Sequence, residues 1–310
     1  MRAGRRRPPR CDGDCVTRST MRRSVFPPIW HSSAMSCLPR SAGEAGASWR
    51  SICSPLTRLR PTLSRPRPRR IPSMRLDGQG LLVLVDPVRT DGAAAARIGR
   101  AAKAAGVRGF LIGSSFDGAA QTHAVARALR ESAPGVPVAL FPGSAMQLTD
   151  QVDLVLFLSL VSGRNPQYLI EEHVRAVPFL RQHPVPTLST AYILIDGGRV
   201  TSVESVSQTR PLPADKPELA AAHATAANLI GMQAIYLDAG SGADRPVSTD
   251  VIRACRAAVP NRPLFVGGGI RTPDQAHVAR QAGADFVVIG TVLEQDPGVR
   301  ELEAFVEAVR

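Results

Sequence analysis

The stretch IYLDAGSGA, residues 235–243, joins an apolar run of strand length to a glycine-rich turn. Two later stretches, LFVGGGIR (264–271) and FVVIGT (286–291), repeat this pattern. Glycine lets the backbone approach a ligand closely, and clustered backbone N–H groups favour an anion. Three successive strand ends of this kind predict one phosphate-sized anion at the mouth of a parallel barrel, with tight turns that simply need glycine as the alternative.

Apolar runs of strand length recur along the chain after residue 74. Because they do not alternate with polar residues, they indicate strands that are covered on both faces. Strand followed by helix, repeated about eight times, predicts a (β/α)8 TIM barrel, and a doubly wound open sheet is the alternative. The first run is not followed by G-x-G-x-x-G, which counts against a dinucleotide-binding fold. The runs are LLVLVD (81–86), GFLIG (109–113), VALFP (138–142), LVLFLSL (154–160), LSTAYILI (188–195), AIYLDAG (234–240), PLFVGGG (263–269) and FVVIGT (286–291).

Helical patterns separate most of these runs. The clearest cover residues 91–106, 165–182 and 272–283, which carry capping residues at their ends. We expect Pro178 to kink or shorten the second of them. The segment 143–151 is too short for a full barrel helix, and the polar segment 196–217 predicts a long loop over the site.

The net charge of +12 is concentrated at the N-terminal side of the chain. Residues 1–73 hold sixteen arginines and three acidic residues, whereas residues 74–310 hold 22 basic and 23 acidic residues. A basic surface for nucleic acid on the folded part therefore does not follow, and we expect no nucleic-acid partner. We interpret residues 1–73 as an Arg/Pro/Ser-rich extension, either disordered or a start-site artefact. A targeting segment and a basic interaction arm are the alternatives.

The cysteines and the hydropathy of the chain indicate the cellular compartment in which the protein works. Four of the five cysteines lie within residues 1–73, and their spacing matches no zinc site or disulfide framework. No apolar run is long enough to span a bilayer. We therefore expect a cytoplasmic protein. Residues 74–310 match the length of one (β/α)8 barrel.

The expected phosphate site lies after the last three strands. Backbone N–H groups and hydroxyl groups there would donate hydrogen bonds to phosphate oxygens. The residues concerned are Gly240, Ser241, Gly242, Gly267, Gly268, Gly269, Gly290 and Thr291.

Tyr236 and Asp238 lie within the strand that leads into this site, and alternation places positions 236, 238 and 240 on one face. A carboxylate in an apolar strand is costly to bury unless it has a function. We predict that Asp238 acts as a general base or holds a substrate hydroxyl, with Tyr236 beside it. A solvated acid at a strand end is the alternative.

A second cluster is expected where the first two strands end. Asp86 ends the first strand, and Ser114 and Ser115 follow the second. A carboxylate and a hydroxyl can contribute two oxygens to Mg²⁺, which takes its other ligands from water and a diphosphate. Strand termination and helix capping by Asp86 explain the pattern equally well. Arg164, after the fourth strand, faces either a diphosphate or solvent.

Six motifs, in this order and spacing, resemble the geranylgeranylglyceryl phosphate synthase family, which includes the bacterial heptaprenylglyceryl phosphate synthases. They are LVDP, LFPGSAMQL, RNPQYLI, YLDAGSGA, VGGGIRT and VVIGT, and the resemblance covers residues 80–310. It implies a modified (β/α)8 barrel whose third helix is replaced by irregular chain. It also implies Mg²⁺-dependent transfer of a prenyl group from a polyprenyl diphosphate to sn-glycerol 1-phosphate, forming an ether.

Carried over by position, the resemblance assigns roles to individual residues. The implied catalytic residues are Asp238 and Tyr236, and the implied metal ligands are Asp86 and Ser115. A groove for the prenyl tail would be lined by residues such as Phe141, Leu158 and Tyr192. The implied sn-glycerol 1-phosphate site comprises Tyr236, Leu237, Asp238, Ala239, Gly240, Ser241, Gly242, Gly268, Gly269, Gly290 and Thr291.

The sequence departs from the family pattern at several of these positions. The acid of the strand-six motif is usually Glu, whereas here it is Asp238. The usual D-P-D-K after strand one is here Asp86-Pro87-Val88-Arg89, so one acid is lost and Lys becomes Arg. These changes bear on metal affinity and on the exact substrate rather than on the fold.

Two other functions stay open on the residues alone. One is another phosphate-binding barrel enzyme, an isomerase or lyase of small-molecule biosynthesis, and the other is a non-catalytic, diverged paralogue. The expected partners are sn-glycerol 1-phosphate and a polyprenyl diphosphate, with a homo-oligomeric assembly and peripheral membrane contact as further expectations.

Overall fold

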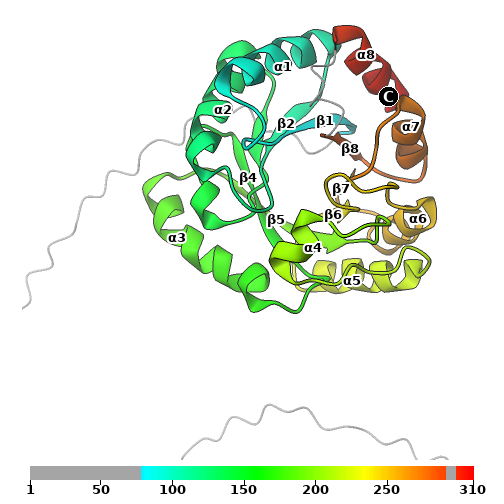
Figure 1. The fold of residues 1–310 in the computed structure, drawn as a ribbon. Coiled ribbons are helices and arrows are strands. Elements are labelled where there is room, and N and C mark those ends of the chain that lie inside the picture. Colours follow the sequence, from blue (N-terminus) through cyan, green and yellow to red (C-terminus); the bar gives the residue numbers. More distant parts are fainter. Residues whose placement is uncertain (1–77, 291–297) are drawn as a thin grey trace, which may run out of the picture. The chain divides into compact units, whose positions relative to one another are not determined.

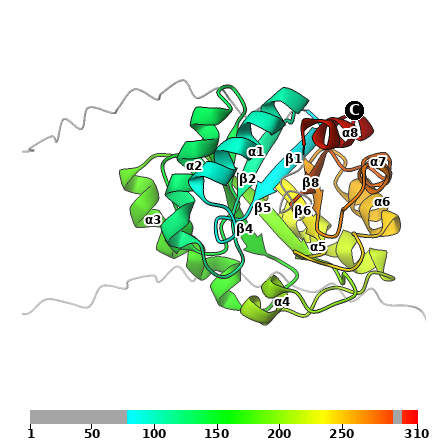
Figure 2. The ribbon, with the colours of Figure 1, turned by 45° about the horizontal axis from the view of Figure 1, so that its top comes forward.

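The computed structural model describes residues 78–290 and 298–310, which contain a closed barrel of parallel strands within a ring of helices (Figures 1 and 2). Each strand pairs with its neighbour in chain order, and β1 pairs with β8 to close the barrel. The TIM barrel and its eight apolar strands are therefore confirmed. The strands are β1 (Gly80–Val85), β2 (Gly109–Ile112), β3 (Val138–Leu140), β4 (Leu154–Leu160), β5 (Thr187–Leu194), β6 (Ala234–Asp238), β7 (Leu264–Gly267) and β8 (Phe286–Ile289).

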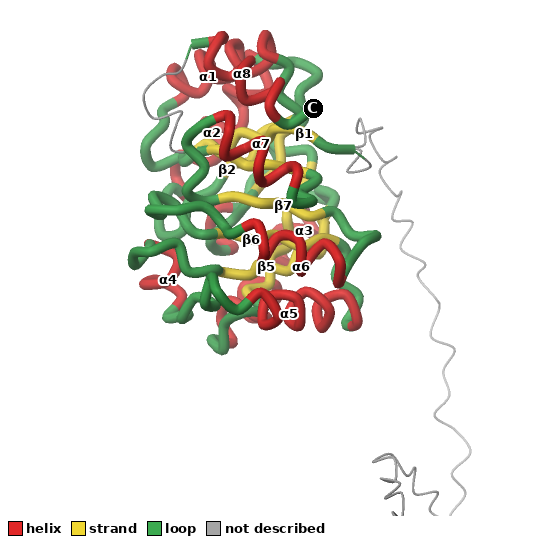
Figure 3. The backbone as a smooth tube through the Cα atoms, turned by 90° about the vertical axis from the view of Figure 1, so that its right-hand side faces the viewer, coloured by secondary structure: helices red, strands yellow, loops and turns green. Residues whose placement is uncertain are grey.

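Full helices follow all of the strands except β3 (Figure 3). After β3 the chain makes only a single 3-10 turn, η1 (Ala145–Gln147), so the expected replacement of the third barrel helix by irregular chain is confirmed. A π-helical turn, η2 (Gln167–Glu171), leads into α3. The helices are α1 (Gly92–Ala105), α2 (Ala119–Ser132), α3 (Glu172–Gln182), α4 (Ser202–Ser207), α5 (Pro217–Leu229), α6 (Thr249–Ala258), α7 (Pro273–Gln281) and α8 (Val299–Ala308).

The capping residues explain where the predicted helices begin and end. Asp91 accepts a hydrogen bond from the backbone N–H of Ala94 at the start of α1, and Gly106 closes that helix at φ 79°. Thr272 and Gln275 form a reciprocal capping box at the start of α7. Asn165 Oδ1 accepts from the N–H of Gln167, which starts the helical segment before α3.

One helix expectation needs correction, and another is settled only in part. Pro178 does not shorten its helix, because α3 continues past it to Gln182, and the expected kink stays a prediction. The segment 196–217 is not loop throughout, because it contains α4. Val203 and Val206 of α4 are three residues apart and both line the cavity described below, so burial of this small apolar face favours the helix.

Alternation along the strands divides the core into two layers. In β6, Tyr236 packs inside the barrel with Phe265 and Phe286, whereas Leu237 packs in the outer layer between strands and helices. The rings of Tyr236 and Phe265 stack with their centroids 5.9 Å apart, and Phe265 and Phe286 follow at 4.9 Å. This aromatic column belongs to the buried inner layer of the barrel, and its upper member, Tyr236, lines the cavity described below.

No helix in the described residues is long and apolar enough to cross a membrane. The extension predicted over residues 1–73 lies outside the described part of the chain, so the division into extension and barrel stays a prediction for that part.

Candidate active site

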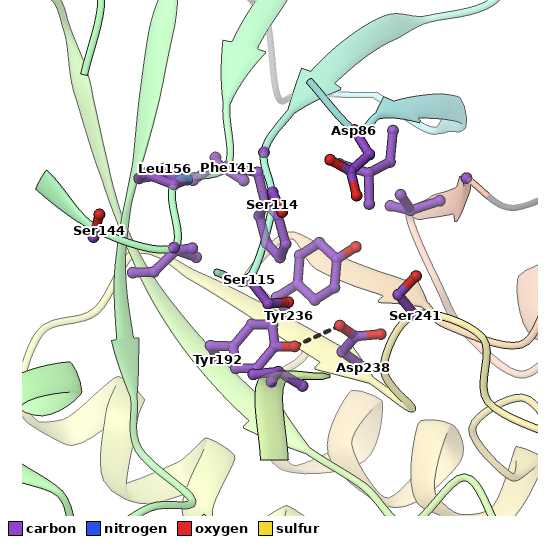
Figure 4. Close-up of a pocket in the computed structure, with 18 of the residues that line it drawn as sticks. Asp86, Ser114, Ser115, Phe141, Ser144, Leu156, Tyr192, Tyr236, Asp238 and Ser241 are labelled. Carbon is purple, nitrogen blue, oxygen red and sulfur yellow. Dashed lines mark hydrogen bonds between the residues drawn. The ribbon is translucent and has the colours of Figure 1, made fainter. Parts of the chain in front are cut away.

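A cavity of about 480 Å³ opens at the carboxyl ends of the strands (Figure 4). It brings together most of the residues predicted for function, although they come from both ends of the sequence. Figure 4 shows Asp86 on one side of the cavity and the Tyr192–Asp238 pair on the other. The predicted site residues that line it are Asp86, Ser115, Tyr236, Asp238, Ser241, Gly268, Gly269 and Gly290.

Other predicted residues lie away from the cavity lining. Leu237 and Ala239 face the outer core layer, because the strand pleat turns alternate side chains away from the barrel interior. Gly240 and Gly242 shape the turn beyond β6 with φ values of 88° and 74°. Thr291 lies outside the described residues.

Arg164 is not among the cavity-lining residues. Its guanidinium group donates to the carbonyl of Gly163 at 2.6 Å, within its own loop. Of the two predicted orientations for Arg164, the structure therefore supports the one away from the diphosphate.

Asp238 is the buried acid of the site, with 8% of its surface exposed. Tyr192 Oη donates a hydrogen bond to Oδ2 at 2.5 Å, and the backbone N–H of Gly240 donates to Oδ1 at 2.8 Å. Desolvation raises the pKa of the Asp238 carboxyl above its ordinary value, and the two hydrogen bonds partly oppose this rise. A carboxylate with a raised pKa and fixed orientation is suited to accept a proton from a substrate hydroxyl.

Two buried tyrosines surround this carboxylate. Burial, reinforced by the negative charge of Asp238, raises the pKa of Tyr192 and of Tyr236 well above the usual value for a phenol. Both hydroxyl groups therefore stay protonated at neutral pH and act as donors. Tyr192 was predicted only as a groove residue. Its hydrogen bond to Asp238 joins β5 to β6, and no local sequence pattern predicts it.

Glycines after β7 allow the backbone to approach Asp238 closely. Gly268 has φ 80°, and a Cβ placed on it would lie 2.4 Å from Asp238 Oδ1. Gly269 has φ 72°, and a Cβ there would lie 2.6 Å from the carbonyl oxygen of Arg245. Both residues line the cavity, so the turn combines exposed backbone with a shape that only glycine permits.

The substitution Gly268→Ala is expected to destabilise the fold by roughly 1–3 kcal/mol and to displace the Asp238 carboxylate. Urea unfolding measures the stability. Gly106→Ala is the matched control, because Gly106 has a similar φ of 79° but open space around its Cβ position. An equal loss of stability in both variants would show that contact with Asp238 adds nothing to the cost.

The side of the cavity at Asp86 contains both acidic and basic side chains. Asp86 Oδ1 accepts from the N–H of Val88 at 2.9 Å, and Oδ2 lies 4.0 Å from Arg89 Nε. Across the described residues there is no group of three His, Cys, Asp or Glu side chains suited to a metal. Asp86 and Ser115 both line the cavity, and a carboxylate and a hydroxyl are ligand types that Mg²⁺ uses when it keeps several waters and takes other oxygens from a substrate phosphate.

Sequence reasoning missed two basic residues on this side. Arg89 and Arg97 line the cavity together with Asp86 and Thr90. Arg89 was noted only as a departure from a family pattern, and Arg97 is one of several arginines in a helical segment. The position of Arg97 one turn after Ala94, which also lines the cavity, is the signal that would have singled it out.

The rest of the cavity is apolar. Phe141, Leu158 and Tyr192 all line it, so the predicted groove residues are confirmed as neighbours. The rings of Phe141 and Tyr236 lie 4.7 Å apart, and those of Phe141 and Tyr192 lie 5.8 Å apart. From this aromatic centre the lining extends past β4 to His173 and Ala176 of α3, in the region beside η1 where a third barrel helix would otherwise pack.

Comparison with known proteins connects this cavity to one group of enzymes. A model described as the PcrB family matches residues 74–309. A geranylgeranylglyceryl phosphate synthase of Spirosoma linguale is 46% identical over 189 residues, covering 61% of this chain and 75% of the relative. One of Thermofilum pendens is 38% identical over 221 residues, covering 71% of this chain and 85% of the relative.

A solved structure adds a ligand to the comparison. The (S)-3-O-geranylgeranylglyceryl phosphate synthase of Thermoplasma acidophilum, in complex with its substrate sn-glycerol-1-phosphate, superposes with a TM-score of 0.71 at 30% identity. The match covers 77% of this chain and 96% of that one.

Proposed function

The chain belongs to the PcrB family and is a prenyltransferase that forms an ether-lipid precursor, and on that premise we propose how its cavity performs the reaction. Its substrates are sn-glycerol 1-phosphate and a polyprenyl diphosphate. The observation that carries the proposal is a buried, hydrogen-bonded carboxylate, Asp238, beside a glycine turn and in the same cavity as Asp86.

The acceptor phosphate binds the turns after β6, β7 and β8. Backbone N–H groups of Gly268, Gly269 and Gly290, together with the Ser241 hydroxyl, are the donors that line the cavity there. Thr291, which lies outside the described residues, completes this set in our proposal. The glycerol hydroxyl then faces Asp238, because Gly268 brings the phosphate turn against that carboxylate.

The donor occupies the other side of the cavity. Arg89 and Arg97 hold the diphosphate electrostatically, and the prenyl tail lies against Phe141 and Leu158. Burial of the tail contributes roughly 0.8 kcal/mol per CH₂. Mg²⁺, held by Asp86 and Ser115, is the proposed cofactor, and when bound it offsets negative charge on the leaving diphosphate.

The reaction exchanges one C–O bond for another. The acceptor hydroxyl oxygen bonds to the terminal allylic carbon of the prenyl group while the bond from that carbon to the diphosphate breaks. Asp238 takes the hydroxyl proton, and Tyr192 holds the carboxylate in place through its hydrogen bond. The diphosphate leaves with the bonding electrons, and the aromatic lining excludes water that would otherwise react with the allylic carbon.

Calorimetric binding of the acceptor tests the phosphate site directly. We expect sn-glycerol 1-phosphate to bind more tightly than its mirror image, sn-glycerol 3-phosphate. The phosphate anchor and Asp238 fix two points of the acceptor, and the cavity wall then admits the secondary hydroxyl in only one of the two arrangements that distinguish the mirror images. Ser241→Ala is expected to weaken binding several-fold through loss of one charge-assisted hydrogen bond. Equal affinity for the two mirror images would contradict the assigned geometry.

A further inference from the structure

We infer that the entrance of the cavity is a docking site for a lipid surface, formed by exposed apolar side chains. This inference rests on the proposed function, because the donor and the ether product are both lipids. The side chains are Val88, Phe116, Met146 and Ile170, which we call the apolar rim.

The apolar rim is exposed and lies at one end of the barrel. Phe116 and Met146 are each 80% exposed, Ile170 is 56% exposed and Val88 is 51% exposed. The four residues follow β1, β2, β3 and β4 in turn, and the carboxyl ends of parallel strands meet at the same end of a barrel. Large side chains of this kind in one region mark an interaction surface rather than scattered exposure.

Direct contacts hold the four segments of the apolar rim side by side. A Cβ on Gly118 would lie 2.7 Å from Pro87 and 3.3 Å from Val88, so the loops after β1 and β2 touch. Gln147 Nε2 donates to the carbonyls of Ser114 and Asp117, both at 2.8 Å, which joins η1 to the loop after β2.

The last connection runs from η1 to the segment after β4. The N–H of Ala145 donates to Glu172 Oε2 at 2.7 Å, which brings η1 against the start of α3. The same segments carry residues of the cavity lining, including Ser115, Ala145 and Tyr168. The apolar rim therefore adjoins the cavity, and a lipid that leaves a membrane there passes from one apolar environment to the next.

Charge is sparse in the two central segments of the apolar rim, whereas Glu171 directly follows Ile170 in the last segment and Arg89 follows Val88 in the first. The loops 113–118 and 141–149 contain a single charged residue, Asp117, so little desolvation opposes their insertion among head groups. Arg89 follows Val88 directly, its side chain is 54% exposed, and it also lines the cavity. It is placed to receive the phosphate of a lipid head group as the tail enters.

A lipid surface fits this position better than a second copy of the chain does. A stable protein interface buries about 800 Å² on each partner with close packing. Such a rigid partner seated on the apolar rim would cover the entrance that the donor must use. A fluid lipid surface can both cover the apolar side chains and supply the donor.

Co-sedimentation with phosphatidylglycerol vesicles tests the inference. We expect the double variant Phe116→Ser, Met146→Ser to bind these vesicles at least ten-fold more weakly than the full wild-type chain. The matched control is Leu229→Ser, Ile230→Ser, because these residues are 78% and 73% exposed but precede β6, at the opposite end of the barrel. The control is expected to bind as the wild type does. Equal vesicle binding by the rim variant and the wild type would overturn the inference.

Two activity measurements distinguish failure of the lipid-docking inference from failure of the proposed function. With a long-chain donor embedded in vesicles, the rim variant should lose activity, whereas with a short, water-dispersed prenyl diphosphate it should match the wild type. Loss with both donors would overturn the docking role. A wild type inactive with both donors would refute the proposed function, and vesicle binding would then decide the inference alone. Sedimentation velocity tests whether a second copy of the chain occupies the apolar rim instead. A change of oligomeric state in the rim variant would show that the surface is an interface between copies, and it would overturn the inference.

Discussion

Asp238→Asn is expected to lower turnover by roughly 10²–10⁴-fold, the usual contribution of a general base. The amide keeps the size of the side chain, but its single oxygen can accept from the Tyr192 hydroxyl or from the Gly240 N–H and not from both. It also cannot take a proton from the acceptor hydroxyl. Affinity for sn-glycerol 1-phosphate should change little, because the phosphate anchor is intact. Steady-state kinetics and calorimetry measure the two effects separately, and unchanged turnover would remove Asp238 from the mechanism.

The raised pKa of Asp238 gives this prediction a pH signature. Activity requires the carboxylate, so the wild type should lose activity as pH falls through a pKa above the ordinary value for an aspartate. Tyr192→Phe removes a hydrogen bond that lowers this pKa, so it should shift the acid limb of the profile to higher pH. The acid limb should be missing in the residual activity of the Asn variant. A profile that is identical in all three proteins would contradict the assignment.

Ionisation of Asp238 at rising pH should lower the stability of the fold, although it raises activity. A raised carboxyl pKa means that the folded protein binds this proton more tightly than the unfolded chain does. The group therefore costs stability as pH rises through the ordinary aspartate range and above it. The Asn variant lacks this cost but loses one of the two hydrogen bonds to Asp238, and the two effects oppose each other. At neutral pH its melting temperature should therefore stay close to that of the wild type. The same melting curve shows whether lost turnover reflects misfolding.

Asp86→Ala is expected to remove most of the activity together with its dependence on Mg²⁺. Asp86 and Ser115 both line the cavity, and no group of three metal-binding side chains occurs in the described residues. In the proposed mechanism, loss of the Asp86 carboxylate would leave the diphosphate with Arg89 and Arg97 alone, which offset the charge on the leaving group less than a divalent ion would. Titration of activity against Mg²⁺ concentration measures the effect.

Asp91→Ala is the control for loss of a nearby acid. Asp91 caps α1 by accepting from the N–H of Ala94 at 2.7 Å, so its removal should cost about 1 kcal/mol of stability without changing the Mg²⁺ titration. Full activity of Asp86→Ala at low Mg²⁺ would place the metal elsewhere. It would also leave Arg89 and Arg97 as the main contacts of the diphosphate.

Much of the fold could be predicted because its signals are local. Uninterrupted apolar runs mark strands that are covered on both faces, and caps such as Asp91 and Thr272 fix where the helices begin. The missing third helix was visible as a segment too short to hold one. The helix α4 was missed because polar residues dominate its sequence, and its two valines matter only once the cavity is present.

The acidic residues and glycines of the site could be predicted from the sequence, but the hydrogen bonds and contacts between site residues could not. Asp238 stood out because a carboxylate in an apolar strand is unusual, and the pleat places it in the cavity and Leu237 outside it. The partner of Asp238 is 46 residues away in sequence, and pattern does not show which side chains meet across two strands. The cavity position of Arg97 likewise depends on how α1 packs. The homo-oligomeric state stays a prediction.

Mass spectrometry of the lipid product tests the central claim most directly. The full chain is incubated with Mg²⁺, sn-glycerol 1-phosphate and a mixture of polyprenyl diphosphates, and the extract is analysed for ethers. We expect one chain length to dominate as its glycerol phosphate ether, and we expect the product to disappear with Asp238→Asn. The absence of any ether product from the wild type, with every donor in the mixture recovered, would contradict the account.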